Sequence, residues 1–242
     1  MSTSPIKINS WAQGLYEVST TKKECLGALR ETEDGRKFRY AKAGASLIPA
    51  GATYAAAVDA AFLAQVQTAG SNALGLTVVQ VLVGATAVTA NLFDDGYLIV
   101  NRTATGTQGL YYPIASHGTS AAGSEFISVT LKEPLVKATL ATDYFSIIPN
   151  PWSSLGISTD IATNFTGMAM VTATSGQYLW VQTGGLGVAT GGDTATMGYP
   201  VGPSDTVQSL EVASTQAGPV VGYAYGSALV STYVTPVMFF CD

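Results

Sequence analysis

The chain has 242 residues, enough for one large domain or two smaller ones. It is 47% hydrophobic and only 11% charged, with a mean hydropathy of +0.28, whereas soluble domains carry about 25% charged residues. The most apolar stretch, residues 76–88, contains Gln80 and Gly84 and is shorter than the roughly 20 residues of a membrane-spanning helix. This composition argues against a membrane-spanning helix and predicts a subunit that buries much of its surface against other subunits.

Charge is distributed unevenly along the chain. Residues 1–42 carry a net charge of +3 and the remaining residues a net charge of −8. A sequence pI of about 4.8 and the lack of a dense Lys/Arg stripe argue against nucleic-acid binding. A basic leading segment on an acidic body favours docking to an acidic protein surface.

Residues 1–24 mix polar residues with isolated large ones such as Ile6, Trp11 and Tyr16, and they show no sustained helical or strand period. We interpret this segment as an extended N-terminal arm that becomes ordered on a neighbouring subunit. Its start lacks the basic and apolar regions of a secretory signal, which predicts synthesis in a cytoplasm. In that reducing compartment, we expect Cys25 and Cys241 to be small buried hydrophobes rather than a disulfide.

A β-hairpin is predicted directly after the arm. Asp34-Gly35 separates two strand-like runs, and glycine tolerates the positive φ that hairpin turns require. In the second run, Phe38 and Tyr40 alternate with Lys37 and Arg39, so the hairpin is both basic and aromatic.

Most of the remaining chain has the pattern of β-strands. Residues 50–69 are the exception, because Val58, Phe62 and Val66 recur every four residues behind Thr53, a possible N-cap, and permit a short helix. Runs rich in β-branched and aromatic residues, separated by turn residues, predict strands at 76–83, 97–101, 111–115, 126–131, 144–148, 168–173, 177–183, 219–228 and 232–240. Residues 184–198 contain 6 glycines and are predicted to be a flexible or tightly turned loop.

These elements predict an all-β fold. We expect an antiparallel β-sandwich or barrel formed by residues 25–69 and 160–242, a second β subdomain inserted at 70–159, and the arm at 1–24. The break Pro149-Asn150-Pro151 supports a boundary near the end of the insertion.

No group of residues forms a recognisable catalytic or metal-binding motif. His117 is the single histidine, and without a Gly-x-Ser-x-Gly nucleophile turn it reads as a loop residue. One histidine and two distant cysteines cannot supply a zinc site, and Asp94-Asp95-Gly96 reads as a turn. The sequence therefore predicts a non-enzyme without catalytic, cofactor-binding or metal-binding residues.

Several stretches resemble the head decoration, or cement, proteins of tailed bacteriophages. They are residues 29–44, which include Asp34-Gly35-Arg36-Lys37-Phe38, and residues 84–101, 176–184 and 219–224. The resemblance implies subunits, commonly trimers, that sit on the outside of a mature capsid and bridge major capsid protein subunits. It therefore implies a virion location on the capsid exterior, after synthesis in the host cytoplasm.

Within that role we expect the arm and the first hairpin to contact the capsid. A buried aromatic side chain at an interface contributes more free energy of binding than an exposed ion pair does. We therefore expect aromatic residues to anchor the contact and charged residues to steer the encounter. The predicted anchors are Trp11 and Tyr16, and the predicted steering residues are Lys22, Lys23, Arg36, Lys37 and Arg39.

Two other classes of protein fit the composition. A head-fibre or tail module that recognises glycans would have a similar strand-rich sequence, and an exposed cluster of Trp11, Trp152 or Trp180 beside carboxylates would favour it. A glycosidase would require two carboxylates facing each other in a cleft.

Overall fold

The structure is a computed structural model, and it describes residues 11–55, 62–63, 66–67, 71–83, 86–102, 109–121, 125–157, 164–191, 196–204, 209–213, 218–226 and 234–241. Within these residues the chain forms sixteen β-strands and no α-helix. Every pairing between two of these strands is antiparallel. The prediction of an antiparallel, all-β fold is confirmed.

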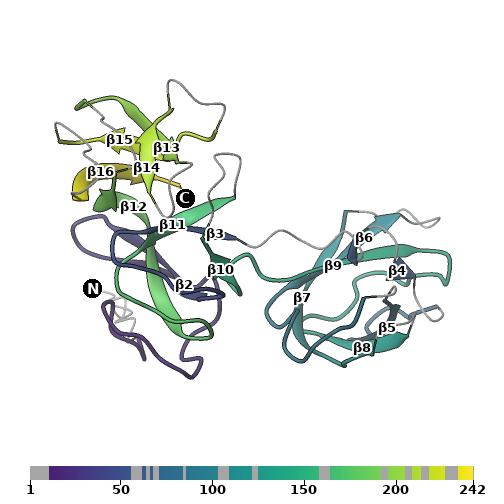
Figure 1. Cartoon of the computed structure of the whole chain (residues 1–242). Coiled ribbons are helices and arrows are strands. Elements are labelled where there is room, and N and C mark those ends of the chain that lie inside the picture. Colours follow the sequence, from purple (N-terminus) through teal and green to yellow (C-terminus); the bar gives the residue numbers. More distant parts are fainter. Residues whose placement is uncertain are drawn as a thin grey trace, which may run out of the picture. The chain divides into compact units, whose positions relative to one another are not determined.

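The chain divides into two compact units, residues 1–55 with 154–242, and residues 56–153 (Figure 1). The first unit contains β1 (Leu29–Glu31), β2 (Lys37–Lys42), β3 (Ala52–Ala55), β10 (Leu155–Gly156), β11 (Phe165–Ala169), β12 (Tyr178–Thr190), β13 (Pro200–Pro203), β14 (Leu210–Val212), β15 (Gly222–Ala224) and β16 (Val234–Phe240). The second contains β4 (Val66–Gln67), β5 (Val78–Leu82), β6 (Tyr97–Arg102), β7 (Tyr111–His117), β8 (Phe126–Leu131) and β9 (Tyr144–Ile148).

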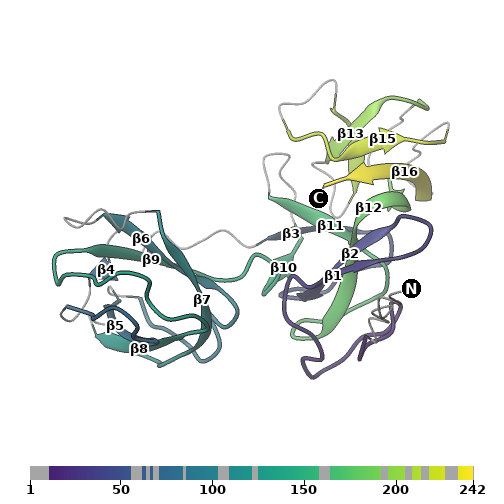
Figure 2. The same ribbon diagram turned by 180° about the vertical axis from the view of Figure 1, so that it is seen from behind.

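The first unit is organised around the long strand β12. Its sheet runs in the order β10-β3-β11-β12-β16-β15-β13-β14, and β2, which pairs with β1, also pairs with β12. Residues from Tyr178 to Gly184 of β12 pair with β2, and residues from Gly184 to Thr190 pair with β16. The first hairpin and the C-terminal strands therefore belong to one sheet, as expected from the hairpin signals at both ends of the chain (Figure 2).

The first hairpin has the turn chemistry that the sequence predicts. Gly35 has a φ of 79° and donates its N–H to the carbonyl oxygen of Thr32, so β1 and β2 are joined through residues 32–36. Phe38 and Tyr40 point into the core of the unit, where they pack with Trp180. From Lys37 to Tyr40, half-buried and buried residues alternate with the period of two, and Ala41 is also buried.

The second unit is a six-stranded sheet in the order β4-β9-β6-β7-β8-β5. Its apolar cluster includes Phe62, Phe93, Leu98, Ile114 and Phe145, all of them buried. The sequence placed this insertion at residues 70–159, whereas the compact unit spans 56–153. The difference at its start arises because Phe62 joins this core and β4 pairs with β9.

The helix expected within residues 50–69 is corrected where the structure describes that segment. Thr53 is not an N-cap; it lies in β3, where its hydroxyl is within 3.0 Å of the Thr166 hydroxyl and donates to the carbonyl oxygen of Gly167. Val66 lies in β4 rather than in a helical turn. Pairing with β11 and β9 satisfies the backbone of these short runs, and this tertiary context overrides a weak helical period. Val58 lies outside the described residues.

The glycine-rich segment after residue 183 is also corrected, because residues up to Thr190 continue β12 instead of forming a loop. Two of its glycines are required by close packing. Gly185 has a φ of 79°, and a Cβ at Gly187 would lie 2.6 Å from Oε1 of Gln182 and 2.8 Å from the Phe239 ring. Glycine therefore marks close backbone approach within a strand here.

Strands β13 and β14 were missed from the sequence. The four residues of β13 include Pro200, Gly202 and Pro203, which are residue types depleted in strands. Their pairing with β14 and β15 is a long-range contact with no local signal.

Two buried tyrosines of the first unit lead to a testable contrast. The Tyr40 hydroxyl donates to Oε1 of Gln13 at 2.7 Å and accepts from the Lys23 N–H at 3.1 Å. The Tyr54 hydroxyl is buried without a hydrogen-bond partner among the described residues. We expect Tyr40→Phe to lower the free energy of unfolding by about 1–3 kcal/mol, because it orphans a buried acceptor, and Tyr54→Phe to leave it unchanged or raise it by up to about 1 kcal/mol. Urea unfolding of the two variants beside wild type measures both effects, and an equal loss in the two variants would contradict the assignment.

The same tyrosines predict a decline of stability at alkaline pH. Burial raises the pKa of both hydroxyls above the usual value of 10.0, and the charge of Glu211 adds to the effect at Tyr54. The folded state favours the neutral phenol. The contribution of each buried phenol to the free energy of unfolding is therefore fully present below the unfolded pKa and is lost as pH rises through the folded pKa. Urea unfolding at about pH 8 and about pH 11 should show a smaller alkaline loss for Tyr54→Phe than for wild type.

Candidate interaction surface

The predicted anchor Trp11 is used within the chain. Its ring makes an edge contact with Trp180, with ring centroids 5.0 Å apart, and Trp180 is fully buried. The Arg30 guanidinium lies 6.0 Å from the Trp11 ring and 5.6 Å from the Trp180 ring, which adds a cation–π interaction. Trp11 therefore anchors the N-terminal segment to its own unit.

Gln13 fixes the same segment in place through five hydrogen bonds. Its side chain donates to the carbonyl oxygens of Glu17 and Tyr178 and accepts from the Tyr40 hydroxyl. Its own carbonyl oxygen accepts from the Trp180 indole at 3.2 Å and from Arg30 at 3.2 Å. Gln13 is 2% exposed, so it behaves as a core residue of the first unit.

The interpretation of residues 1–24 as an arm that is ordered on a neighbour is therefore wrong for residues 11–24. These residues contribute side chains to the core and a bridge between Ser19 and Tyr178. Trp11, which an isolated arm could not bury, packs half-buried against Trp180 of β12 in the same chain. Residues 1–10 lie outside the described residues.

The second predicted anchor, Tyr16, lies beside one of the predicted steering residues. Tyr16 is 58% exposed, and its hydroxyl accepts a hydrogen bond from Nη1 of Arg36 at 3.1 Å. The Arg36 Nε also pairs with Asp34 at 2.7 Å. Of the predicted contact residues, these two are brought together on the surface.

Of the other predicted basic residues, one contacts Gly27, one contacts β12 and two are exposed. Nη1 of Arg39 donates to the carbonyl oxygen of Gly27 at 2.9 Å, and the Lys37 side chain covers Gly184. Lys22 and Lys23 are exposed. Arg36, Lys37 and Arg39 thus combine surface charge with contacts that support the first hairpin.

An apolar surface of the first unit was not among the predicted contact sites. On β12, β15 and β16, one set of side chains points outward and the alternate set, including Val237 and Phe239, is buried. Register places Leu186 and Tyr223 on either side of Met238, and Val188 opposite Pro236. We call this surface the apolar face, and it consists of Leu186, Val188, Tyr223, Val234, Pro236, Met238 and Phe240.

The apolar face is well exposed and carries no charge. Val234 is 57% exposed, Tyr223 48% and Phe240 46%. Strands β12, β13, β15 and β16 contain no Asp, Glu, Lys or Arg. Antiparallel sheets usually put polar side chains on a solvent-facing side, so an apolar outer side is typical of a surface that is covered by a partner.

The sequence contains a signal for this surface. Val234, Pro236, Met238 and Phe240 are apolar at alternate positions, and the residues between them are also mostly apolar. A strand that is apolar on both sides is expected to be buried on both sides.

A pocket opens at the edge of the apolar face, beside the turn of the first hairpin. It has a volume of about 460 Å³. Its lining consists of Asp34, Arg36, Met170, Gln182, Leu186, Gly187, Val188 and Pro236. The pocket therefore joins apolar walls from β12 and β16 to a polar rim from residues 34–36.

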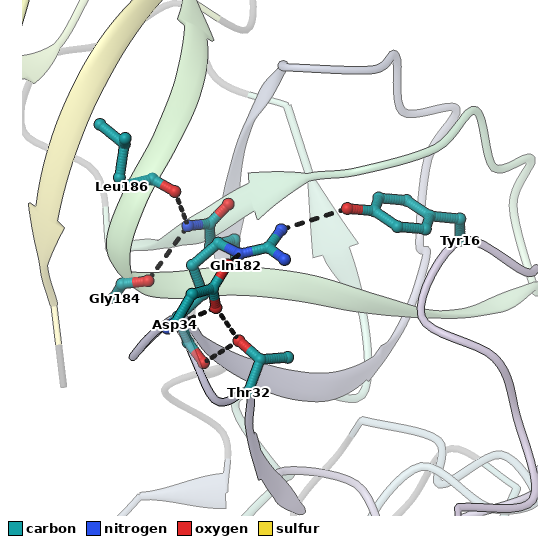
Figure 3. Close-up of polar contacts among 7 residues, drawn as sticks. Tyr16, Thr32, Asp34, Gln182, Gly184 and Leu186 are labelled. Carbon is teal, nitrogen blue, oxygen red and sulfur yellow. Dashed lines mark hydrogen bonds and ion pairs between the residues drawn. The ribbon is translucent and has the colours of Figure 1, made fainter.

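Gln182 is the buried polar group of this pocket. Its amide donates to the carbonyl oxygens of Gly184 at 3.1 Å and Leu186 at 3.0 Å, which supports the irregular register of β12 (Figure 3). Those two bonds identify the nitrogen and leave Oε1 as an acceptor. This oxygen is buried and has no hydrogen-bond partner among the described residues.

The polar rim contains one negative and one positive side chain, Asp34 and Arg36. Hydrogen bonds from Thr32 and Arg36 lower the pKa of Asp34, and hydrogen bonds to Tyr16 and Asp34 raise the pKa of Arg36. Figure 3 shows Thr32, Asp34 and Tyr16 around this rim. The pair stays ionised near neutral pH and presents a hydrogen-bonding edge to the apolar pocket.

The single histidine and the two cysteines, which could take part in catalysis or metal binding, are not part of the apolar face or of its pocket lining. The His117 side chain is buried at the end of β7, where Nε2 accepts the Phe93 N–H at 3.1 Å and Nδ1 lies 2.7 Å from the Gly118 carbonyl oxygen. Cys25 is exposed, so the expectation of two buried cysteines is wrong for it, while the half-buried Cys241 donates to the Val221 carbonyl oxygen. Among the described residues, no group of three His, Cys, Asp or Glu side chains is arranged to hold a metal ion.

Comparison with known protein families, curated proteins and solved structures finds no match in any of the three. Within the part of the chain that the structure describes, no helix has the length and apolar character needed to cross a membrane.

Proposed function

We propose that this chain is a structural subunit of a virion, a decoration protein that binds the outside of a phage capsid and stabilises the shell by bridging major capsid protein subunits. The observation that carries the proposal is the exposed, uncharged apolar face. A surface of this kind is rare on soluble monomers and is expected where subunits assemble. The role requires neither a cofactor nor catalysis.

The proposal includes self-association, with a trimer as the expected state. The chain has few charges to cover its surface, and the described strands of the apolar face have none. Two copies of such a face meet without repulsion between like charges. Closed symmetric assembly is the common way in which soluble proteins cover such a surface.

Capsid binding would use a different part of the first unit. Lys22 and Lys23 are exposed and would supply positive charge toward an acidic capsid surface. A ligand that binds only the expanded shell stabilises that shell. Weak individual contacts suffice for this, because many of them act together over the shell.

The glycan-binding alternative is less well supported by the tryptophans. Trp180 is fully buried and Trp11 is half-buried against it, so neither forms the exposed platform that a sugar-binding site uses. The pocket beside the apolar face is lined by aliphatic side chains, Met170 and a polar rim, without an aromatic ring.

The test is the number and position of copies in particles that contain this chain. Quantitative mass spectrometry against the major capsid protein, combined with a cryo-EM reconstruction, should place copies on every capsomer at the outer surface. A few copies at a single vertex, or copies inside the shell, would contradict the proposal and favour a tail or fibre role.

A further inference from the structure

Strand β12 has an open edge beyond the first hairpin. Strand β2 pairs with β12 only as far as Gly184, because the hairpin turns back at Asp34-Gly35. Beyond Gly184, β16 pairs along the opposite edge of β12 as far as Thr190. Residues 186–189 therefore have a strand neighbour on one edge, and we call their other edge the open edge.

The register of β16 shows which backbone groups face the open edge. The Pro236 carbonyl oxygen accepts a hydrogen bond from the N–H just after β15, so it faces β15. Successive residues of a strand direct their backbone groups to alternate edges, so those of Val237 face β12 and meet Gly187. The backbone groups of Leu186 and Val188, on either side of Gly187, therefore face the open edge.

Two hydrogen bonds at this edge agree with that direction. The Leu186 carbonyl oxygen accepts from the Gln182 amide at 3.0 Å, and the Thr190 N–H donates to the Ala50 carbonyl oxygen at 2.9 Å (Figure 3). Between them, the N–H of Leu186 and both backbone groups of Val188 make no hydrogen bond with the described residues. An unpaired strand edge of this kind is a template for an additional strand.

The pocket lies along the same edge and gives it apolar walls. Its lining includes residues 186–188 of β12, Met170 and Pro236. The first hairpin bounds the open edge at Arg36, and Ala50 bounds it at the other end. About four strand residues, or roughly 13 Å, separate these two ends, so the edge fits a short extended segment.

The N-terminal segment approaches the pocket along β12. Ser19 forms a bridge with Tyr178, and Trp11 packs on Trp180, so the chain advances along β12 toward the pocket in going back from residue 19 to residue 11. Trp11 and Met170 pack against the same aromatic cluster, and Met170 is also part of the pocket lining. The residues before Trp11 are therefore tethered beside the pocket.

The sequence of residues 5–10 suits the open edge. This segment, Pro-Ile-Lys-Ile-Asn-Ser, lies outside the described residues. In an extended chain, Ile6 and Ile8 point to one side and Lys7 to the other. Two β-branched apolar side chains match the apolar walls, and six extended residues span about 20 Å, which is enough to go from Trp11 along the open edge.

We propose that residues 5–9 add to the open edge of β12 in their own chain and place Ile6 and Ile8 against the pocket. The direction of approach makes this pairing antiparallel, as are the strand pairs of the described residues. The same chain is the favoured source because a short tether holds the segment at an effective concentration of about millimolar. The added segment covers an edge that is otherwise free to pair with another chain. The inference is independent of the proposed capsid role.

Amide hydrogen exchange measured by NMR tests this pairing in the full chain and in a chain that lacks residues 1–9. The N–H groups of Leu186 and Val188 should be protected in the full chain and should exchange about tenfold faster or more after the deletion. The N–H groups of Gly187 and Ala189 face β16 in both chains and are the internal control. Protection of Leu186 and Val188 that survives the deletion, or that is absent from the full chain, overturns the proposal.

Substitutions in the full chain test which side chains dock. The double variant Ile6→Ser with Ile8→Ser keeps the backbone and removes the apolar contacts, so it should raise exchange at Leu186 and Val188 about tenfold or more. Lys7→Ser lies between the two isoleucines and is the matched control, which should exchange like wild type. Equal exchange in the double variant and the control contradicts docking through the isoleucines.

A peptide and a mixing experiment identify the source of the added strand. An acetylated and amidated peptide of residues 4–10 should restore protection to the truncated chain, and the same peptide with serine at both isoleucine positions should bind about tenfold more weakly or not at all. Equal binding of the two peptides overturns the site. Unlabelled full chain, mixed with labelled truncated chain well below millimolar concentration, should not restore protection, because its own segment is already docked. Protection in that mixture assigns the strand to a neighbouring copy and overturns the contact within one chain.

Discussion

Deleting residues 1–20 should lower the stability of the first unit by about 3 kcal/mol or more beyond the effect of deleting residues 1–10. The longer truncation removes the Trp11 ring from Trp180 and the Gln13 side chain from Tyr40. It leaves the Trp180 indole and the Tyr40 hydroxyl as buried donors without their acceptor. The lost apolar contact and the orphaned donors together outweigh the chain entropy that is recovered when the segment is absent.

Calorimetry of the full chain and the two truncations measures this effect. A loss of about 3 kcal/mol corresponds to a decrease in Tm of roughly 10 °C for a unit of this size. Gln13→Ala in the full chain serves as an intermediate variant, because it removes the hydrogen bonds of the side chain and keeps the Trp11 contact. If removal of residues 11–20 left the Tm unchanged, the N-terminal segment would not be an integral part of the first unit.

Because residues 11–20 support the fold, their removal does not test capsid contact by the N-terminus on its own. Loss of capsid occupancy after removal of residues 1–20 would report damage to the fold as well as loss of a contact. Substitutions at Lys22 and Lys23 change the charge of this segment and leave the Gln13 and Trp11 contacts in place. Because exposed charges act mainly on the encounter rate, the effect of these substitutions should diminish as the salt concentration rises.

Met238→Asp should weaken self-association by about 100-fold or more while leaving the chain folded. Met238 lies at the centre of the apolar face, between Leu186 on β12 and Tyr223 on β15. An unpaired carboxylate that is buried between two apolar faces costs several kcal/mol, and the same carboxylate on a free subunit is solvated.

Sedimentation equilibrium and thermal unfolding of the same variant separate these two effects. Val136→Asp is the matched control, since it adds the same charge at an exposed apolar residue of the second unit, 60% exposed against 38% for Met238. Equal association of Met238→Asp and Val136→Asp would show that the apolar face is not the subunit contact. A large decrease in Tm for Met238→Asp would indicate a role of this side chain within the sheet.

The two predictions divide the first unit into a folding surface and an assembly surface. Trp11 and Gln13 complete the core around Trp180, on the part of β12 that pairs with β2. The apolar face lies on the part of β12 that pairs with β16. The long strand β12 therefore carries a packed core at one end and the exposed apolar face at the other.

The sequence by itself determined the class of fold and several local elements. Alternation of side chains along residues 37–42 and the Asp34-Gly35 turn predicted the hairpin of β1 and β2 correctly. Turn residues between short β-branched runs predicted most strands of the second unit. These features could be predicted because strand periodicity and turn conformation depend on residues close together in the chain.

Only the tertiary structure decided which residues of the predicted arm pack into the core and which apolar strand residues remain exposed. Trp11 is separated from Trp180 by most of the chain, and nothing local distinguishes a docked aromatic from one in a free arm. The same holds for β16, where both sides of the strand are largely apolar and only the packing of Val237 and Phe239 into the core shows which side is covered. The pocket arises in the same way, because Gln182, the residue 34–36 turn and Pro236 meet only when three strands pair. Burial is a property of contacts between distant segments, so periodicity fixes the two sides of a strand but not which of them meets a neighbour.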